Sequence, residues 1–510
     1  MARRIIICCD GTWNTPDERD GGVPVPTNVV RIYNAVADRD KNGVVQTKYY
    51  HPGVGTGGSW WDKAIGGGTG RGLDRNIMSA YRELCDQYEP GADIFLFGFS
   101  RGAYTVRSLG GLITCCGLLD PRGLKEPEIW SRINRMFDSG YRTKKETRRN
   151  WDELDWKFHN ERDKKVLIHF LGVWDTVGAL GIPDDMALLN LLDELRDHTF
   201  HDTVLSPTVT HARHAVALDE MRASFQPTLW TAVAANQDVE QVWFPGVHSD
   251  VGGGYRETGL SDGALKWMID ESAKCGLVFN PQMVAQIEPD ELDVLHDSCC
   301  GVFSVLPTQP RGAPLIRAGR DVHPSAVSRH GNPPIHQCPY RPVRNLGPEP
   351  MTLDIFAAQQ WNFTGIWLER GTEYTFTASG EWMDSSIKCG PDGTYRDNFQ
   401  IGEVAQMLGT ALGKAEDLFK KVTGYPSADF KFTRRHENFP WFALIGAVAN
   451  GELDTKGTWT PHESFLIGSE GRSFTPEKSG YFYAYANDAW NTYGNNRGHL
   501  ELTIKARPKS

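Results

Sequence analysis

Long apolar runs are missing from this 510-residue chain: none approaches the length of about 20 residues that a transmembrane helix requires. A signal-peptide pattern is missing too, because the first ten residues are basic but their apolar run is too short. Long basic runs are absent, and the net charge of −10 argues against binding to nucleic acid. We therefore expect a protein without a transmembrane segment that is cytoplasmic as synthesised.

The ten cysteines form neither a disulfide framework nor a metal-binding pattern. Six of them are adjacent pairs, which cannot bond internally without strain, and no C-x-x-C spacing occurs. We expect reduced thiols, as in a protein made in the cytoplasm.

The chain is too long for one hydrophobic core, and its pattern changes twice. Residues 1–305 alternate strand-like and helix-like segments, which is typical of an α/β fold with a mostly parallel sheet. Residues 306–350 are rich in Pro, Arg and Gly, which indicates a connection. Residues 351–510 carry short alternating strands between Gly, Asp and Asn turns, which predicts a β-sandwich, interrupted by a helix at 404–421.

In the first region, continuous apolar runs predict buried strands and amphipathic stretches predict helices. Two further stretches, 121–160 and 183–214, predict helical insertions of the kind that builds a lid over a site. The expected strands are Arg4–Cys9, Ile94–Phe97, Val166–Val173 and Gln241–Phe244, and the expected helices are Leu73–Gln87, Ala103–Thr114 and Asp262–Cys275.

A G-x-S-x-G motif lies at residues 98–102, between an expected strand and an expected helix. On such a strand–turn–helix the serine adopts strained backbone geometry with its hydroxyl above the sheet, and the glycines let strand and helix approach closely. The motif alone arises by chance in a chain with 53 glycines, but this setting is much more specific. We interpret Ser100 as the nucleophile of a serine hydrolase.

A catalytic serine needs a base and an acid that orients the base, each on a loop after a strand. Asp175 follows the expected strand 166–173, and His248 follows the expected strand 241–244. The chain order Ser, Asp, His is the one that α/β-hydrolases use. We predict Asp175 as the acid and His248 as the general base, with Asp250 either a competing acid or a residue that positions the His248 loop.

An oxyanion hole combines the N–H that follows the nucleophile with an amide from another strand end. Arg101 supplies the first N–H. The loop after the first strand supplies the second, and Gly11 and Thr12 are the candidates. An ordinary Asp-Gly turn is the alternative interpretation of that loop. This chemistry requires no cofactor.

Four ordered motifs together resemble the α/β-hydrolase family of type VI secretion lipase effectors: CDGTWN at 9–14, GFSRGAY at 98–104, VWDTVG at 173–178 and HSDVGGG at 248–254. The resemblance spans about residues 4–280. It implies an α/β-hydrolase-like fold and a phospholipase or related carboxylester hydrolase with Ser100, Asp175 and His248 as its triad. The missing signal peptide is compatible with export by a signal-independent machine such as a type VI secretion system.

The C-terminal region contains an oxygen-rich loop, residues 487–496, around a glycine turn. Calcium takes about 6–8 oxygen ligands and suits such a loop, although Asn/Asp/Gly loops are more often plain turns. The wider segment 351–505 resembles PA-I-like galactophilic calcium lectins, through Trp382, the turn KCGPDG at 388–393 and the closing stretch 486–498.

The lectin resemblance implies a calcium ion that also coordinates the hydroxyls of a galactose-type sugar. The ligands that it implies are the side-chain oxygens of Asp488, Asn495 and Asn496, a backbone oxygen of Thr492 and a further backbone oxygen near Asp384 or Ser385.

Together these patterns predict a serine carboxylester hydrolase, phospholipase- or lipase-like, that is targeted by a calcium-dependent carbohydrate-binding domain. Holding the hydrolase near a glycan-bearing surface raises its encounter rate with ester bonds there. The substrate is then a lipid, with peripheral membrane contact, or an acyl group on a glycan, which would make the enzyme an esterase or deacetylase. The remaining alternative is a carbohydrate-binding protein with an inactive hydrolase scaffold.

Overall fold

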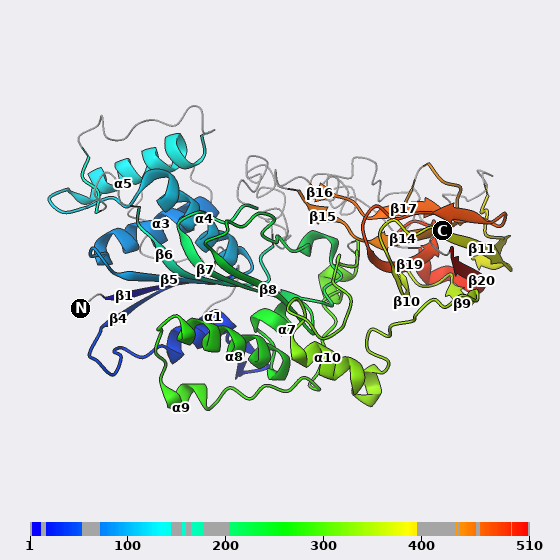
Figure 1. The fold of residues 1–510 in the computed structure, drawn as a ribbon, viewed down its shortest axis with the longest axis horizontal. Helices are drawn as coiled ribbons and strands as arrows, with labels where there is room; N and C mark the ends of the chain where they lie inside the picture. Colours follow the sequence, from blue (N-terminus) through cyan, green and yellow to red (C-terminus); the bar gives the residue numbers. More distant parts are fainter. Residues whose placement is uncertain are drawn as a thin grey trace.

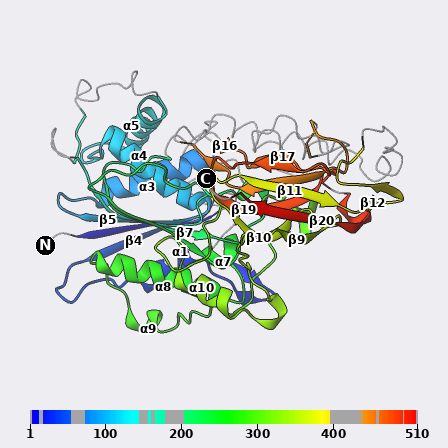
Figure 2. The ribbon, with the colours of Figure 1, turned by 45° about the vertical axis from the view of Figure 1, so that its right-hand side comes forward.

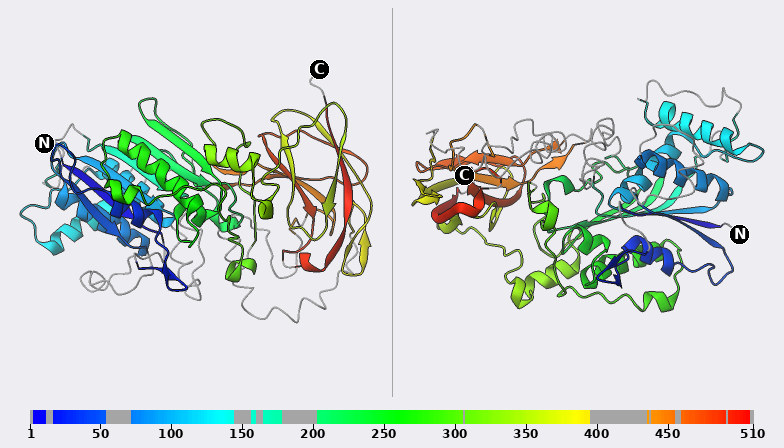
Figure 3. Two further views of the ribbon diagram at one scale, coloured as in Figure 1. Left: turned by 90° about the horizontal axis from the view of Figure 1, so that it is seen from below. Right: turned by 180° about the vertical axis from the view of Figure 1, so that it is seen from behind.

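Two bodies of secondary structure follow one another along the chain (Figure 1), and the views from below and behind show the same division (Figure 3). We call residues 3–305 the N-terminal domain, residues 307–350 the connection and residues 351–507 the C-terminal domain. The computed structural model describes residues 3–11, 17–53, 72–143, 156–159, 165–177, 203–305, 307–394, 435–436, 438–454, 459–490 and 492–507.

A six-stranded sheet forms the centre of the N-terminal domain. Its strands are β1 (Arg4–Cys9), β4 (Gln46–His51), β5 (Asp93–Phe99), β6 (Ile168–Trp174), β7 (Val209–Ala217) and β8 (Asp238–Phe244). They lie in the order β4-β1-β5-β6-β7-β8, and all neighbours run parallel. Parallel strands end at one edge of the sheet, so the loops after β5, β6 and β8 meet there.

Helices cover both faces of this sheet, which is why its strands are apolar on both sides. In β1, Ile5 and Ile7 pack into one core and Ile6 packs into the other. One face carries α3 (Gly72–Gln87), α4 (Arg101–Cys116) and α5 (Glu126–Met136), and the other carries α1 (Asn28–Ala35), α8 (Gly259–Lys274) and α9 (Pro281–Val284) (Figure 1). The smaller elements are β2 (Arg19–Asp20), β3 (Val23–Pro24), α7 (His248–Gly252) and the short helices Phe137–Tyr141, Ala223–Phe225 and Gly301–Val305.

The predicted strands and helices of the N-terminal domain are all present, but the predicted helical insertion at 183–214 is wrong at its C-terminal end. Residues 209–214 belong to β7, which lies between β6 and β8. The polar residue Arg213 interrupts the apolar run that would indicate a buried strand. In the structure Arg213 is buried, and it donates to Glu271 at 2.7 Å. Residues 178–202 lie outside the described residues. In the other insertion, 121–160, α5 is helical as predicted, and residues 144–155 lie outside the described residues.

The C-terminal domain contains two larger antiparallel sheets (Figure 2). One core between them contains Phe376 and Trp382 of one sheet and Phe482 of the other. The predicted helix at 404–421 lies outside the described residues. One sheet contains β10 (Asn362–Leu368), β19 (Gly480–Ala486), β14 (Leu444–Ala449) and β17 (Glu463–Leu466). The other contains β13 (Ile387–Cys389), β12 (Trp382–Asp384), β20 (Asn496–Ala506), β11 (Tyr374–Ser379) and β18 (Arg472–Phe474), and β9 (Met351–Phe356) also pairs with β20. Separately, β15 (Glu452–Leu453) pairs with β16 (Trp459–Thr460). A short helix spans Tyr493–Asn495.

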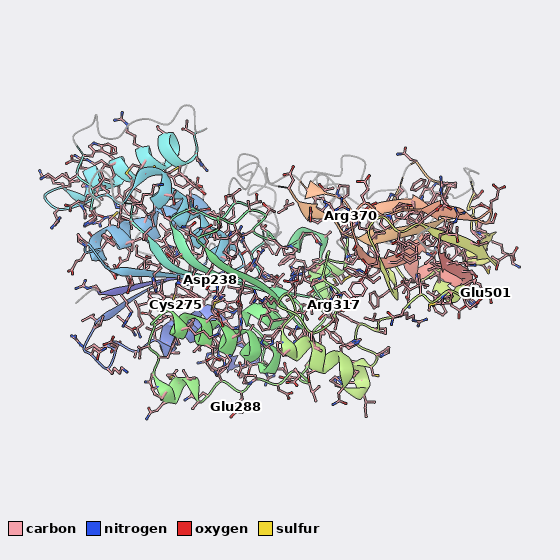
Figure 4. All side chains as sticks on the ribbon, viewed as in Figure 1. Asp238, Cys275, Glu288, Arg317, Arg370 and Glu501 are labelled. Atoms are coloured by element: carbon pink, nitrogen blue, oxygen red, sulfur yellow. The ribbon has the colours of Figure 1, made fainter. Side chains whose placement is uncertain are left out.

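The connection packs against both domains. It contains α10 (Pro324–Gly331) and the short helix Ile335–Gln337, and its apolar side chains share a core with Trp243 of β8. On the other side, Ile316 N–H donates to the Tyr481 hydroxyl at 2.9 Å. Arg317, labelled in Figure 4, marks this part of the chain between the domains. Among the described residues, no helix is long and apolar enough to cross a membrane.

Candidate active site and candidate calcium centre

Ser100 occupies a sharp turn between β5 and α4. Its φ of 57° and ψ of −122° are rare for a residue with a side chain, and they match the strained turn on which a nucleophilic serine is presented. The Ser100 N–H donates to the Trp174 carbonyl at 3.1 Å, which ties the turn to the end of β6. The side chain is buried, and no described residue hydrogen-bonds its hydroxyl oxygen.

Both glycines of the G-x-S-x-G motif are required by close packing. A Cβ on Gly98 would lie 2.5 Å from the Gly102 carbonyl oxygen. A Cβ on Gly102 would lie 2.0 Å from the Cys9 carbonyl oxygen. Both contacts are with backbone atoms, which cannot give way as the end of a flexible side chain can, so the sequence needs glycine at both positions. The first turn of α4 therefore abuts the end of β1.

Asp175 follows β6, next to Ser100 at the same sheet edge. It also has a positive φ, 37°, and its side chain is fully buried. Its Oδ2 accepts a hydrogen bond of 2.6 Å from His248 Nδ1, and its Oδ1 accepts one of 2.9 Å from the Ala217 N–H. The structure therefore brings the predicted acid and the predicted base together.

His248 is the first residue of α7, and only 4% of it is exposed. Its ring lies between two aromatic rings, with centroid distances of 4.6 Å to Phe99 and 5.0 Å to Phe225. Phe99 directly precedes Ser100, so the imidazole lies beside the nucleophile turn. Because Nδ1–H donates to Asp175, the other nitrogen, Nε2, carries the lone pair that a general base needs.

Burial and charge act on the two groups in different ways. Burial favours the neutral form of Asp175, but the Arg311 guanidinium and the His248 hydrogen bond outweigh burial and hold the pKa of Asp175 well below its usual range. Burial lowers the pKa of His248, and Asp175 opposes that effect. At neutral pH the arrangement is therefore an ionised aspartate beside a neutral histidine.

Asp250 is not the acid partner of His248. Its Oδ1 lies 2.6 Å from His296 Nδ1, and its Oδ2 accepts the Val247 N–H at 3.0 Å. Asp250 thus holds the turn that leads into α7, which is the second of the two roles considered for it. A Cβ on Gly246 would lie 2.3 Å from the Asp250 Cβ, so this turn too is tightly packed.

The candidate oxyanion groups in the described part of the chain are Arg101 and Gly11. Arg101 is the first residue of α4 and directly follows Ser100. The Gly11 N–H donates to the Asp10 carboxylate at 2.7 Å. Asp10 is itself held by the Thr27 hydroxyl at 2.6 Å. Thr12 lies outside the described residues.

Two side chains at the site gave no sequence signal. Arg311, from the connection, donates to both oxygens of Asp175. Glu220, just after β7, accepts the His248 N–H at 3.2 Å and is held by Arg222, which with other contacts keeps the pKa of this buried group at about 2. Neither residue lies in a recognisable motif, and only the fold brings them to the site.

The second cluster lies in the C-terminal domain, where the predicted calcium ligands come together. Asp384 of β12 is in register with Asn496 of β20, and the Ser385 N–H donates to the Asn495 carbonyl at 3.3 Å. Asn496 Nδ2 donates to Asp488 Oδ2 at 2.8 Å. The Asn495 N–H in turn donates to the Thr492 carbonyl at 3.1 Å.

Two observations show that this cluster is rich in oxygen acceptors. Burial, together with the charge of Asp488, raises the pKa of Asp384 to about 6, and burial also raises the pKa of Asp488. The Asn496 Oδ1 is buried and no described residue hydrogen-bonds it. A hard cation with oxygen ligands would offset the repulsion and use the orphaned oxygen, so the residues fit calcium. Within the described part of the chain, no group of three or more His, Cys, Asp or Glu side chains is placed to hold a metal ion, so a calcium site here would depend on amide and backbone oxygens as well.

Residues 3–271 match the family model described as type VI secretion system (T6SS), phospholipase effector Tle1-like, catalytic domain. A curated relative, the uncharacterized protein YEL023C of Saccharomyces cerevisiae, is 34% identical over 246 residues, which make up 45% of this chain and 33% of that protein. The chain thus spans only a part of that relative.

Three solved structures show weaker likenesses. An uncharacterized protein from Pseudomonas aeruginosa is 21% identical, with 57% of this chain and 49% of that chain covered and a TM-score of 0.32. The Tle1 effector bound to the VgrG spike of the type 6 secretion system is 17% identical, with 51% and 53% covered and a TM-score of 0.27. The EclA N-terminal domain, a PllA-like lectin, is 14% identical, with 31% and 95% covered and a TM-score of 0.18. At these scores the likenesses support no argument about fold or function.

Proposed function

Because the chain belongs, through residues 3–271, to the family of Tle1-like type VI secretion phospholipase effectors, we propose that it is a serine hydrolase that cleaves carboxylic esters of phospholipids. The observation that carries the proposal is the 2.6 Å hydrogen bond between His248 Nδ1 and Asp175 Oδ2, beside the strained Ser100 turn. The family description supports delivery by a type VI secretion machine and a membrane phospholipid as substrate, with peripheral contact between protein and bilayer.

In the proposed mechanism, Ser100 Oγ attacks the ester carbonyl carbon while His248 Nε2 takes the hydroxyl proton. Ionised Asp175 stabilises the imidazolium that forms and keeps Nε2 aimed at the nucleophile. In this proposal the Arg101 N–H stabilises the oxyanion, and Thr12 is the remaining candidate for the second amide because the Gly11 N–H already donates to Asp10. The ester C–O bond then breaks, and His248 returns the proton to the departing alcohol oxygen. Water, deprotonated by His248, releases the fatty acid and restores Ser100.

The electrostatics of the site support these roles. A general base must be neutral before the reaction, and the lowered pKa of buried His248 keeps it so at neutral pH. Asp175 must stay ionised despite burial, and its own pKa is held low. The two groups have clearly separated ionisation states, as acid–base assignment in such a site requires.

The test is hydrolysis by the wild type and by Ser100→Ala of three substrates: short p-nitrophenyl esters, phosphatidylcholine vesicles and acetylated xylan. We expect turnover of the esters and vesicles that the substitution abolishes. The matched control is Ser272→Ala, which removes an equally buried serine hydroxyl from α8, away from the site. Preference for acetylated xylan would instead indicate a glycan deacetylase. Turnover that survives in Ser100→Ala would overturn the serine mechanism.

For the C-terminal domain we propose calcium-dependent binding of a sugar, of the galactose type that the lectin resemblance implies. Side-chain oxygens of Asp488, Asn495 and Asn496 would hold the ion, together with the backbone oxygen of Thr492 and one near Asp384 or Ser385. The ion would supply a Lewis-acidic centre for sugar hydroxyls. The buried carboxylates with raised pKa values and the orphaned Asn496 Oδ1 support this assignment. Binding to a glycan-bearing surface would raise the local concentration of ester substrate around the hydrolase.

Calcium binding is tested by titration calorimetry with calcium chloride on the full chain, followed by retention on galactose resin with and without a chelator. We expect binding in the wild type, loss of binding in Asp488→Asn, and elution by the chelator. Glu501→Gln is the control, because Glu501 is an exposed carboxylate on the same strand, β20 (Figure 4). Equal calcium binding by wild type and Asp488→Asn would contradict the site. Resin binding without Ser100-dependent turnover of any substrate would favour the inactive-scaffold alternative.

A further inference from the structure

We propose that Arg311, which the connection inserts into the N-terminal domain, is a positioning residue of the triad and completes the active site from outside the catalytic-domain sequence. The inference rests on the proposed serine hydrolase function. Residues 3–271 match the family's catalytic domain, and Arg311 lies beyond them. The catalytic domain by itself would therefore be an incomplete enzyme.

The Arg311 guanidinium donates hydrogen bonds to both carboxylate oxygens of Asp175. Its Nη1 donates to Asp175 Oδ1 at 2.6 Å and its Nη2 donates to Asp175 Oδ2 at 2.9 Å. The side chain is fully buried, as is that of Asp175. Nη1 also donates to the Ala217 carbonyl at 2.8 Å, and Nη2 donates to the Phe225 carbonyl. Two-armed geometry of this kind fixes both the position and the plane of a carboxylate, which a lysine cannot do.

The hydrogen bonds between Arg311 and Asp175 also set the orientation of His248. Asp175 Oδ2 is shared between Arg311 and His248 Nδ1, so rotation of the carboxylate would break both contacts. The Phe225 carbonyl that Arg311 holds belongs to the residue whose ring packs on His248. Arg311 therefore fixes two of the surfaces that keep the imidazole in place. Its hydrogen bonds are to Asp175, Ala217 and Phe225 and not to Ser100, so it acts through Asp175.

The backbone around Arg311 is held by the opposite domain. His462 Nε2 lies 2.7 Å from the Pro310 carbonyl oxygen, while His462 Nδ1 accepts the Gly451 N–H at 2.6 Å. Since Nδ1 accepts, Nε2 carries the proton and donates to Pro310. On the other side of Arg311, a Cβ on Gly312 would lie 2.9 Å from the Gly451 carbonyl oxygen. The C-terminal domain thus contacts the backbone at residues 310 and 312. The Arg311 side chain between them points into the N-terminal domain.

The charge of Arg311 has a measurable consequence for His248. The charged groups around His248 are Asp175 after β6, Glu220 and Arg222 after β7, and Arg311 from the connection. His214 of β7 is also close to Asp175, but it is buried and its lowered pKa of about 3 leaves it neutral. Arg311 offsets the negative charge of Asp175, which is the charge that favours the imidazolium. We therefore expect removal of Arg311 to raise the pKa of His248 through the uncompensated charge of Asp175.

The experiment compares wild type, Arg311→Met and Arg311→Lys in the full chain on a soluble p-nitrophenyl ester across pH. For Arg311→Met we expect kcat to fall by about 100-fold, as when a catalytic group is displaced by about 1 Å, with little change in KM. The acidic limb of its pH profile should move up by about one unit, because a neighbouring cation has been removed. Arg311→Lys, which keeps the charge but loses the two-armed contact, should lose kcat without the pH shift.

Arg329→Met is the matched control. Arg329 lies in α10 of the same connection and is equally buried. It donates to the Glu291 and Asp293 carbonyls and not to the triad acid. It should lower the thermal midpoint of unfolding and leave the pH profile unchanged. An unshifted profile and wild-type kcat in Arg311→Met, with turnover still abolished by Ser100→Ala, would overturn the Arg311 assignment alone. Absence of Ser100-dependent turnover in the wild type would instead overturn the proposed function.

Discussion

Both domains bury acidic side chains, but they stabilise them in opposite ways. Asp175 is buried among donors, and the Arg311 charge and the His248 hydrogen bond keep its pKa low. Asp384 and Asp488 are buried near each other, and the pKa of each is raised. The Arg435 charge lowers the pKa of Asp488, but by less than burial raises it. In the first cluster, groups of the chain itself compensate the buried negative charge. In the second cluster they do not compensate it fully.

This difference indicates what each cluster is built for. A catalytic aspartate must be ionised in the empty enzyme, so its counter-charge has to be part of the protein. A cation site must be able to gain positive charge, so its carboxylates are left without full compensation until the ion binds. We infer that the same residue type serves the proposed catalysis in one domain and the proposed ion binding in the other because its neighbours differ.

The largest expected effect comes from Asp175→Asn. An asparagine would favour the wrong tautomer of His248, and the corresponding change in serine proteases lowers kcat by about 10⁴-fold. It would also leave the Arg311 charge buried without its partner, which costs about 3–5 kcal/mol of unfolding free energy. The measurements are ester hydrolysis and chemical denaturation. The equivalent substitution in the other cluster, Asp488→Asn, should leave hydrolysis of a soluble ester at the wild-type rate.

Equal loss of ester hydrolysis in both variants would break the comparison, since it would mean that the clusters act on one site. Retained activity in Asp175→Asn would reassign the acid, and Glu220 would become the next carboxylate to test, because it accepts the His248 N–H.

Calcium should stabilise the wild type and act only through the C-terminal cluster. At a calcium concentration 100 times its Kd, binding to the folded state contributes about 2.7 kcal/mol. Thermal unfolding with and without calcium chloride measures this effect. We expect the shift to persist in Asp175→Asn and to vanish in Asp488→Asn. A calcium-dependent shift of equal size in Asp488→Asn would place the ion elsewhere.

The triad candidates could be predicted from the sequence because each lies where a strand pattern stops. Ser100, Asp175 and His248 follow strands in a fixed order, and parallel strands end at one edge. The calcium candidates were found by resemblance, since an Asn- and Asp-rich loop has no periodicity of its own. In both cases the residues that the sequence suggested lie together in space.

Residues that act through long-range contacts could not be predicted. Arg311 lies in a Pro- and Gly-rich stretch that indicates only a connection, and 136 positions separate it from Asp175. The sequence pattern predicts a helical insertion over part of strand β7, because Arg213 and His214 are polar. Their partners, Glu271 and Gln241, make them suitable for burial, but those partners are known only once the sheet has formed. Pairings across the fold leave no local pattern.

The two clusters should also respond differently to pH. Asp384 has a usual pKa of 3.8 that is raised to about 6, so its contribution to stability is fully present below pH 3.8 and is lost as pH rises through about 6. The pKa of Asp175 is depressed, so its contribution is present above its usual range and is lost only as pH falls through the depressed value. Calcium affinity should weaken as pH falls through about 6, because protonation of Asp384 removes a negative charge beside the proposed ion.

Ester hydrolysis should instead rise as pH rises through the pKa of His248, which lies below its usual 6.5. Calorimetric titration and initial rates across pH 4–8, a range of about four units around these values, measure the two responses. In Asp384→Asn the pH dependence of calcium binding near 6 should disappear while the hydrolysis profile stays in place. A shift of the hydrolysis profile in this variant would show that the clusters are coupled.

The smallest expected effect sharpens the comparison at the point where the domains meet. His462→Phe removes the donor to the Pro310 carbonyl and the acceptor for the Gly451 N–H. Loss of one such hydrogen bond costs about 0.5–1.5 kcal/mol, so we expect kcat to fall only a few-fold. Because Arg311 and its charge are still present, the pH profile should not move, and calcium binding should be unchanged. His499→Phe, on the exposed side of β20, is the control. If His462→Phe lowers the thermal midpoint of unfolding but leaves kcat at the wild-type value, the contacts of His462 only join the domains. If kcat falls while the thermal midpoint is unchanged, the C-terminal domain sets the geometry of Asp175 through residue 310.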